Sequence, residues 1–241
     1  MMLGAGLVAA GWFSAILMMK GSLGPIEQDA VARETLPSTV ARSSSPPSRV
    51  APTPTSIPDS SIPKQVYHGA GTDVVDLTTP VEVGVLAFDC PRCGDRAEVT
   101  TNAGIDEQVI SHFTGGPYSG MRWLGMRGGV TSRVQVKAEG PWTLTIGGLD
   151  LAARYDGAQP VSGTGDAVVL LETAPDTVDV SHSGESNFTV KLMTDRHRTG
   201  PDLVVNEIGK FRGTVFFDVS GTDAALVEVG ADGAWTLVPQ R

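Results

Sequence analysis

From Lys64 to its end, the chain is dominated by short segments in which apolar and polar residues alternate. Residues 81–86, 133–138 and 189–192 show this alternation clearly. Side chains two positions apart lie on the same face of a β-strand, so each segment predicts a strand with one buried face. Gly, Asp, Asn and Pro separate the segments at intervals of roughly 8–12 residues, which is typical of β-sandwiches and small barrels. The pattern predicts an all-β fold of jelly-roll or immunoglobulin-like sandwiches.

Three parts of this region recur in the same order further along the chain. Residues 69–77 (GAGTDVVDL) return as 163–171 (GTGDAVVLL), 116–120 (GPYSG) as 209–213 (GKFRG), and 134–144 (VQVKAEGPWTL) as 227–237 (VEVGADGAWTL). The offset is 94 residues for the first pair and 93 for the other two. This regularity predicts one unit built twice, as a first β-sandwich over residues 65–150 and a second, homologous one over 151–241. The repeated Trp142 and Trp235 are expected to anchor the two cores.

The hydrophobic pattern differs at the start of the chain. Residues 2–19 contain no charged side chain, and Lys20 ends the apolar stretch. A helix of about 20 apolar residues spans the hydrocarbon core of a bilayer, so residues 1–23 predict a transmembrane helix. No basic residue precedes the stretch and no small-x-small cleavage site directly follows it, which favours a retained signal-anchor over a cleaved signal peptide.

Residues 24–64 are expected to form a disordered linker. They hold eight of the 16 prolines of the chain and eight serines, without apolar periodicity. Such a segment buries too little apolar surface to offset the entropy of ordering it. The linker would hold the β-region away from a membrane.

The charge distribution narrows the class of partners. The net charge is -9, and residues 65–241 carry 13 basic and 23 acidic side chains. An acidic surface repels the phosphates of nucleic acids and of anionic lipids. We therefore expect no nucleic-acid partner, and a membrane contact only through the N-terminal helix.

Cys90 and Cys93, the only cysteines of the chain, are separated by Pro91 and Arg92. A local disulfide, half of a metal site and a redox dithiol all fit this spacing, and the disulfide is favoured because a closed zinc site needs four ligands. The matching stretch of the second repeat, 181–188, has no cysteine. The pair is therefore interpreted as a local addition to one loop.

The remaining chemistry-bearing residues form no catalytic or metal-binding motif. The four histidines lack metal-ligand spacing, no Gly-x-Ser-x-Gly elbow occurs, and the Gly-x-Gly segments precede strands, so they predict turns or bulges rather than phosphate loops. Loop carboxylates such as Asp166 are interpreted as solvated, because no calcium loop surrounds them. We expect no catalytic residue, no metal and no cofactor.

The sequence between Gly163 and Leu237 has a recognisable order of segments: GTGDAVV, HSGESNFTV, LVVNEIGKFRG and ADGAWTL. It resembles uncharacterised β-sandwich modules in exported or membrane-anchored proteins of high-GC Gram-positive bacteria. The first repeat departs from this order, since Cys90 to Cys93 replace the His-Ser-Gly stretch. The resemblance implies a fold and a location, and it implies no catalytic residue.

Together these features predict a single-pass membrane protein whose C-terminal region lies outside the cell. We expect a non-enzymatic binding module that contacts a protein or a glycan of the cell envelope. A carbohydrate-binding module is one alternative, and it would need aromatic rings on one exposed face. Its candidate ligand contacts are Tyr118, Trp123, Tyr155 and Phe211. A thiol-redox protein using Cys90 and Cys93 is the other.

Overall fold

The computed structural model describes residues 62–103, 107–113, 115–126, 128–194, 201–219 and 224–240. Within these ranges the chain forms seventeen β-strands and one 3₁₀ turn, Leu149–Leu151, which confirms the prediction of an all-β fold. The expected transmembrane helix and all but the last three residues of the expected linker lie outside the described residues. No helix in the described ranges is long and apolar enough to cross a bilayer.

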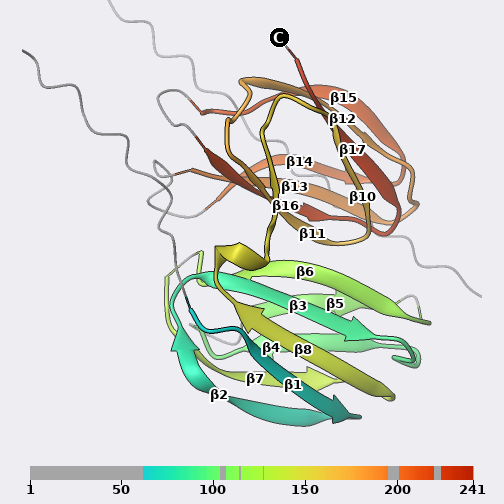
Figure 1. Cartoon of the computed structure of the whole chain (residues 1–241). Helices are drawn as coiled ribbons and strands as arrows, with labels where there is room; N and C mark the ends of the chain where they lie inside the picture. Colours follow the sequence, from blue (N-terminus) through green and yellow to red (C-terminus); the bar gives the residue numbers. More distant parts are fainter. Residues whose placement is uncertain are drawn as a thin grey trace, which may run out of the picture. The chain divides into compact units, whose positions relative to one another are not determined.

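The first eight strands form two four-stranded antiparallel sheets (Figure 1). One sheet has the order β1 (Gln65–Ala70), β8 (Pro141–Gly147), β3 (Gly84–Cys90), β6 (Tyr118–Leu124). The other has the order β2 (Asp73–Val81), β7 (Thr131–Lys137), β4 (Ala97–Thr101), β5 (Glu107–His112). Phe88 and Leu144 from the first sheet and Val99 and Val136 from the second share one buried cluster. The two sheets therefore pack face to face, and we call strands β1–β8 the first sandwich.

The remaining strands form a second sandwich. One sheet has the order β10 (Val161–Thr164), β17 (Ala234–Pro239), β12 (Thr177–His182), β15 (Phe211–Phe216). The other has the order β14 (Asp202–Ile208), β13 (Asn187–Met193), β16 (Ala225–Gly230), β11 (Ala167–Leu171), β9 (Ala153–Tyr155). Phe188, Val190 and Val227 pack with Val180 and Leu237 of the facing sheet. Among the described strands, only the short β9 pairs in parallel, with β11.

The two sandwiches have the same strand order. When β10–β17 are substituted for β1–β8, the order β1-β8-β3-β6 becomes β10-β17-β12-β15, and β2-β7-β4-β5 becomes β11-β16-β13-β14. Eight strands that pass between two sheets in this order form a jelly roll. The immunoglobulin-like alternative has a different strand order and does not describe these sheets.

In each sandwich the Gly-x-Gly segment holds a buried tryptophan in place, an arrangement that we call the tryptophan seat. Trp142 is 3% exposed, and its Nε1 donates a hydrogen bond to the Gly71 carbonyl oxygen at 2.9 Å. Trp235 makes the same bond to Gly165, also at 2.9 Å. Gly71 and Gly165 have φ angles of 73° and 72°, which favour glycine. The expected turns and the expected tryptophan anchors are thus both confirmed.

The two sandwiches meet along a seam formed by β6 on one side and the outer face of the β11 and β16 sheet on the other. Trp123, Val168 and Leu226 belong to an apolar cluster separate from both cores. Strand β16 is buried at every position, whereas β7, which occupies the matching place in the first sandwich, alternates between buried and exposed residues. Burial on both faces of this sheet follows from its contact with the first sandwich.

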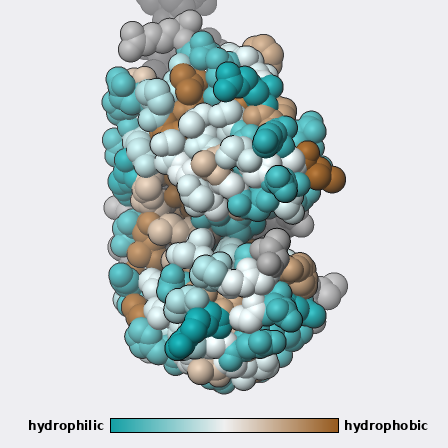
Figure 2. Space-filling view, turned by 90° about the vertical axis from the view of Figure 1, so that its right-hand side faces the viewer, coloured by the Kyte–Doolittle hydropathy of each residue, from teal (hydrophilic) through white to brown (hydrophobic). Residues whose placement is uncertain are grey.

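Elsewhere on the described surface, large exposed apolar side chains are spread over several strands and loops. The most exposed are Ile208 at 80% and Phe216 at 79%, followed by Phe113 at 60%. Figure 2 shows a face on which hydrophilic and neutral residues predominate and hydrophobic residues form small separate groups. Scattered exposed apolar residues are normal for a soluble surface. These scattered residues form no site, and the seam is the feature of the described residues that is considered next.

The tryptophan seat predicts the effect of a single methyl group. A Cβ added at Gly163 would overlap the Trp235 ring, so Gly163→Ala should lower the free energy of unfolding by about 1–3 kcal/mol. Ser162→Ala, an exposed change on the same strand, should alter it by less than about 0.5 kcal/mol. Urea unfolding followed by tryptophan fluorescence measures both, and equal stabilities of the two variants would contradict this account of the seat.

Candidate functional site: a cleft at the seam

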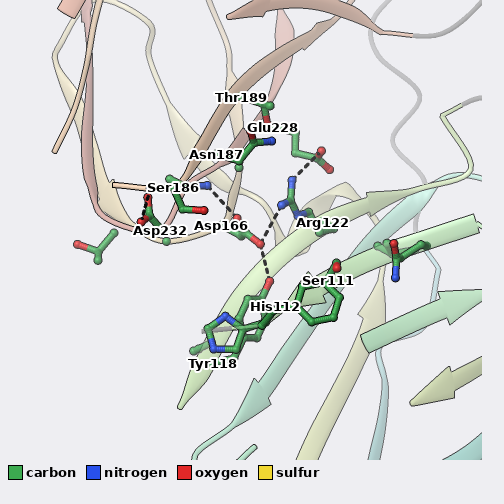
Figure 3. Close-up of a pocket in the computed structure, with 18 of the residues that line it drawn as sticks. Ser111, His112, Tyr118, Arg122, Asp166, Ser186, Asn187, Thr189, Glu228 and Asp232 are labelled. Carbon is green, nitrogen blue, oxygen red and sulfur yellow. Dashed lines mark hydrogen bonds and ion pairs between the residues drawn. The ribbon is translucent and has the colours of Figure 1, made fainter. Parts of the chain in front are cut away.

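A cleft of about 730 Å³ opens at the seam. Strands β5 and β6 and the turn between them line it from the first sandwich. The turn between β10 and β11, strands β13 and β16 and the turn between β16 and β17 line it from the second. Figure 3 shows the side chains that converge on it. Pockets preferentially form where two structural units meet, and this cleft has walls from both.

Arg122 lies at the centre of an ion-pair network that crosses the seam (Figure 3). Its Nη2 lies 2.9 Å from Asp166 Oδ2, and its Nη1 lies 3.1 Å from Glu228 Oε1. The Tyr118 hydroxyl also donates to Asp166 Oδ2, at 2.6 Å. Two residues of β6 are thereby joined to two carboxylates of the second sandwich, and charge-assisted hydrogen bonds of this kind are the strong ones.

The same carboxylates are also bound by other groups. Glu228, which is 2% exposed, accepts hydrogen bonds from Lys191 Nζ at 2.8 Å and from the Trp123 backbone amide at 3.0 Å. Asp166 Oδ1 accepts one from the Ala231 amide at 2.9 Å. The Asp166 carbonyl oxygen accepts another from the Met121 amide at 3.0 Å. Strand β6 is the edge of its sheet, so the second sandwich satisfies amides that the sheet leaves without partners.

These contacts fix the protonation states of Arg122 and Tyr118. Burial would lower the pKa of Arg122, but the charges of Asp166 and Glu228 outweigh it and raise that pKa, so the guanidinium stays charged. Burial and the Asp166 charge together raise the pKa of Tyr118 far above its ordinary value. The phenol therefore stays neutral and acts as a hydrogen-bond donor. Neither group is set up to exchange protons with a substrate near neutral pH.

Neutral polar side chains complete the cleft lining. The ion-pair network uses none of the side chains of Ser111, Ser119, Asn187 and Thr189. Ser111 and Asn187 are exposed and lie on opposite walls, one on β5 and the other on β13. Phe113 also lines the cleft and is 60% exposed, although the Arg96 guanidinium lies 5.3 Å from its ring centroid. Hydroxyl, amide and aromatic groups are thus available to a ligand.

The four aromatic residues singled out from the sequence lie in different places. Tyr118 is in the cleft wall, bound to Asp166, and Trp123 is 7% exposed within the seam cluster. Tyr155 and Phe211 are half-buried against the core of the second sandwich. The four rings therefore form no common exposed face, and the exposed ring at the cleft belongs to Phe113.

Sequence reasoning did not identify Arg122 or Glu228, and its interpretation of Asp166 as a solvated carboxylate is wrong. The Asp166 side chain is 10% exposed and paired within the seam. A signal for Glu228 was present, because it interrupts the apolar run of residues 225–229, whereas the matching residues 132–136 alternate. A charged residue inside an otherwise apolar strand indicates a buried partner.

Cys90 and Cys93 lie at disulfide-bonding distance, with their Cα atoms 5.4 Å apart. Both are fully buried in the first core, where Cys90 pairs in register with Tyr118 of β6. The Glu139 amide donates to the Cys93 carbonyl oxygen at 3.1 Å, which joins this turn to the turn between β7 and β8. The pair thus fastens the end of the first sandwich next to the cleft wall.

The second sandwich fastens the equivalent turn without cysteines. Buried His182 takes the place of Cys90, and its Nε2 lies 3.1 Å from Asp232 Oδ1. Asp232 Oδ2 accepts hydrogen bonds from the amides of Glu185 at 3.0 Å and Ser186 at 2.8 Å. His182 Nδ1 also lies 2.8 Å from the Gly209 carbonyl oxygen. A polar cluster here does the work of the cysteine pair.

No group of three or more His, Cys, Asp or Glu side chains placed to hold a metal ion occurs in the part of the chain that the structure describes. Asp232, at the edge of the cleft, is bound by His182 and by backbone amides. Asp166 and Glu228 are bound by cations and amides. The carboxylates of the cleft are therefore already engaged by groups of the chain.

The network predicts a large difference between two arginine substitutions. Arg122→Leu leaves Asp166 without a cationic partner and Glu228 with Lys191 as its one cation, and it should lower the free energy of unfolding by about 3 kcal/mol. Arg154→Leu removes only an exposed pair with Glu172 and should cost less than about 1 kcal/mol. Urea unfolding of both variants measures the difference, and similar values would show that the network adds little to stability.

The Asp232 contacts predict an acid-sensitive contribution to stability. Burial raises the pKa of Asp232, but the amides of Glu185 and Ser186 and the nearby His182 outweigh it and lower that pKa below its ordinary value. A lowered folded-state pKa stabilises the fold above the unfolded value of about 3.9, and this stabilisation disappears as the pH falls through the folded pKa. Asp232→Asn should therefore destabilise the protein at pH 7, by an amount that shrinks below about pH 4. Urea unfolding at pH 7 and pH 3 tests this, and a pH-independent difference would contradict it.

Comparisons with known proteins leave the function to be argued from this geometry. No protein-family model matches the chain, and a search of curated proteins found no significant match. The paired charges and the neutral lining of the cleft are therefore the observations on which a functional conclusion rests.

Proposed function

We propose that the protein is a non-enzymatic binding module of the cell envelope, and that the cleft at the seam is its ligand-binding site. In this proposal the chain consists of two homologous jelly-roll units, joined by the linker of residues 24–64 to a membrane helix over residues 1–23. The two units lie outside the cell.

The observation that carries the proposal is the pairing of charges in the cleft. Arg122 and Lys191 are bound by Asp166 and Glu228, and the Tyr118 phenol donates to Asp166. A general acid or base needs a proton that it can exchange near the working pH, and a nucleophile needs a base beside it. These groups are instead committed to holding the walls together, which favours binding over catalysis.

The network also gives the cleft a preformed shape. Its two walls come from different sandwiches, and the hydrogen bonds that Glu228 and Asp166 accept from β6 fix one wall against the other. A preformed site loses less conformational entropy when it binds a ligand, so a modest number of contacts yields useful affinity. This arrangement supports a recognition role for the seam.

The comparison of the two sandwiches supports duplication followed by specialisation. They share the strand order and the tryptophan seat. The residues of the network are not shared, since the repeat offset aligns Tyr118 with Phe211 and Arg122 with Val215. Asp166 and Glu228 are likewise aligned with Thr72 and Gln135 of the first repeat. Two copies of one unit have thus acquired different residues where they meet, and the cleft arises there.

The proposed location rests on the apolar N-terminal stretch, the Pro/Ser-rich linker and the cysteine pair. Disulfides persist in oxidising compartments, so a bonded pair fits an exported domain. Full burial of both sulfur atoms disfavours the thiol-redox alternative, since a redox-active cysteine must reach its substrate.

The proposal predicts that small changes on either wall of the cleft weaken binding. The full chain, purified in detergent micelles, would be titrated against a cell-envelope fraction of a high-GC Gram-positive bacterium. Ser111→Ala and Asn187→Ala each remove one polar contact worth about 0.5–1.5 kcal/mol, so each should raise the dissociation constant roughly two- to tenfold.

Matched substitutions outside the cleft control this experiment. Asn206→Ala and Ser162→Ala change the same residue types at exposed strand positions, and both should bind like the unaltered chain. Absence of envelope binding would overturn the proposed function. Binding that is equally strong in the cleft variants would remove the cleft as its site.

A further inference from the structure

We infer that the ligand of the cleft is an uncharged, polyhydroxylated molecule, that is, a segment of a neutral glycan chain. This inference rests on the proposed function, because it names the ligand class of the same site. Three features of the cleft carry it: its compensated charges, its neutral polar lining and its exposed aromatic ring.

The charges disfavour an ionic ligand of either sign. An anionic ligand would have to compete with Asp166 and Glu228 for Arg122 and Lys191, and a cationic ligand would have to compete with Arg122 for the carboxylates. Breaking one buried pair leaves a partner uncompensated, which is strongly unfavourable. The surplus of acidic residues in 65–241 further repels anions. A neutral ligand leaves the network intact.

The groups outside the network match hydroxyl-bearing molecules. Ser111, Ser119 and Thr189 offer hydroxyls that both donate and accept, and the amide of Asn187 offers two donors and an acceptor. Sugar hydroxyls have the same dual character, so they pair with such groups without transfer of a proton. The groups lie on both walls, which suits a ligand with hydroxyls along two edges.

Phe113 supplies the apolar element that a sugar ring requires. Phe113 lines the cleft and is 60% exposed, and the Arg96 guanidinium lies 5.3 Å from its ring centroid. Pyranose rings carry C–H groups on their faces and hydroxyls around their edges, so they pack on an aromatic ring while their edges form hydrogen bonds. The open cleft of about 730 Å³ has room for a short segment of such a chain.

The experiment uses the full chain in detergent micelles and murein sacculi that have been boiled in SDS and treated with protease to remove proteins. The chain should bind these sacculi saturably, and an uncharged N-acetylglucosamine hexamer should compete with them. Phe113→Ala should raise the dissociation constant at least threefold. Phe216→Ala, which removes an equally large exposed ring outside the cleft, should leave it unchanged.

The outcomes separate the ligand class from the binding role. Binding to the untreated envelope fraction that is lost after protease treatment, with Ser111→Ala and Asn187→Ala still weakening it, would overturn the glycan and keep the cleft. Failure of the hexamer to compete, or equal affinities of the Phe113→Ala and Phe216→Ala variants, would also overturn the inference. Loss of all envelope binding would instead refute the proposed function itself.

Discussion

The structure of the seam depends on the burial of Arg122 between two carboxylates of the other sandwich. Burying a charge is costly unless it is paired and hydrogen-bonded, and here each partner has further ligands. Glu228 accepts from Lys191 and from the amide of Trp123, and Asp166 accepts from Tyr118 and Ala231. Because the bonds of Arg122, Tyr118 and the Trp123 amide to these carboxylates cross between the sandwiches, the network holds the two walls of the cleft together. An apolar seam without these ion pairs would bury the same strands, but it would fix the position of one sandwich against the other less closely.

The two sandwiches show which parts of the repeated unit are needed for folding. The tryptophan seat is identical in both, down to the bond from the indole to a glycine with positive φ. The turn after the third strand is fastened differently, by Cys90 and Cys93 in one sandwich and by His182 and Asp232 in the other. The fold therefore requires that this turn be held, and either a covalent link or a polar cluster satisfies it. Features that differ between the copies are the better guide to function, because folding does not constrain them to match.

Much of the fold could be predicted from the sequence, but most of the site could not. Alternation of period two located β7 and β13, but the segment 81–86 that was also predicted as one strand contains the end of β2, a bend at residues 82–83 and the start of β3. The repeated Gly-x-Gly and tryptophan predicted turns and anchors that the structure confirms. Those signals are local, since they depend on neighbours in the chain. The partners of Arg122 lie 44 and 106 residues away, and no local pattern reports such a distance. Trp123 was proposed as a ligand contact because the seam that buries it cannot be seen in one repeat. Only a comparison of residues 225–229 with 132–136 would have shown that one sheet is covered on both faces.

The duplication that we propose would produce such a cleft without a new fold. A free edge strand and an outer sheet face exist in every copy of a jelly roll, so two linked copies can cover one edge with one face. In this chain the covering face carries Leu226 where the first sandwich has Arg133, and it carries Asp166 and Glu228, which bind the edge. Ser111, Phe113 and Asn187, which line the hollow beside that contact, belong to neither core cluster. Ser111, Phe113 and Asn187 were therefore free to change without loss of the fold, and it is at such positions that a binding specificity can be selected.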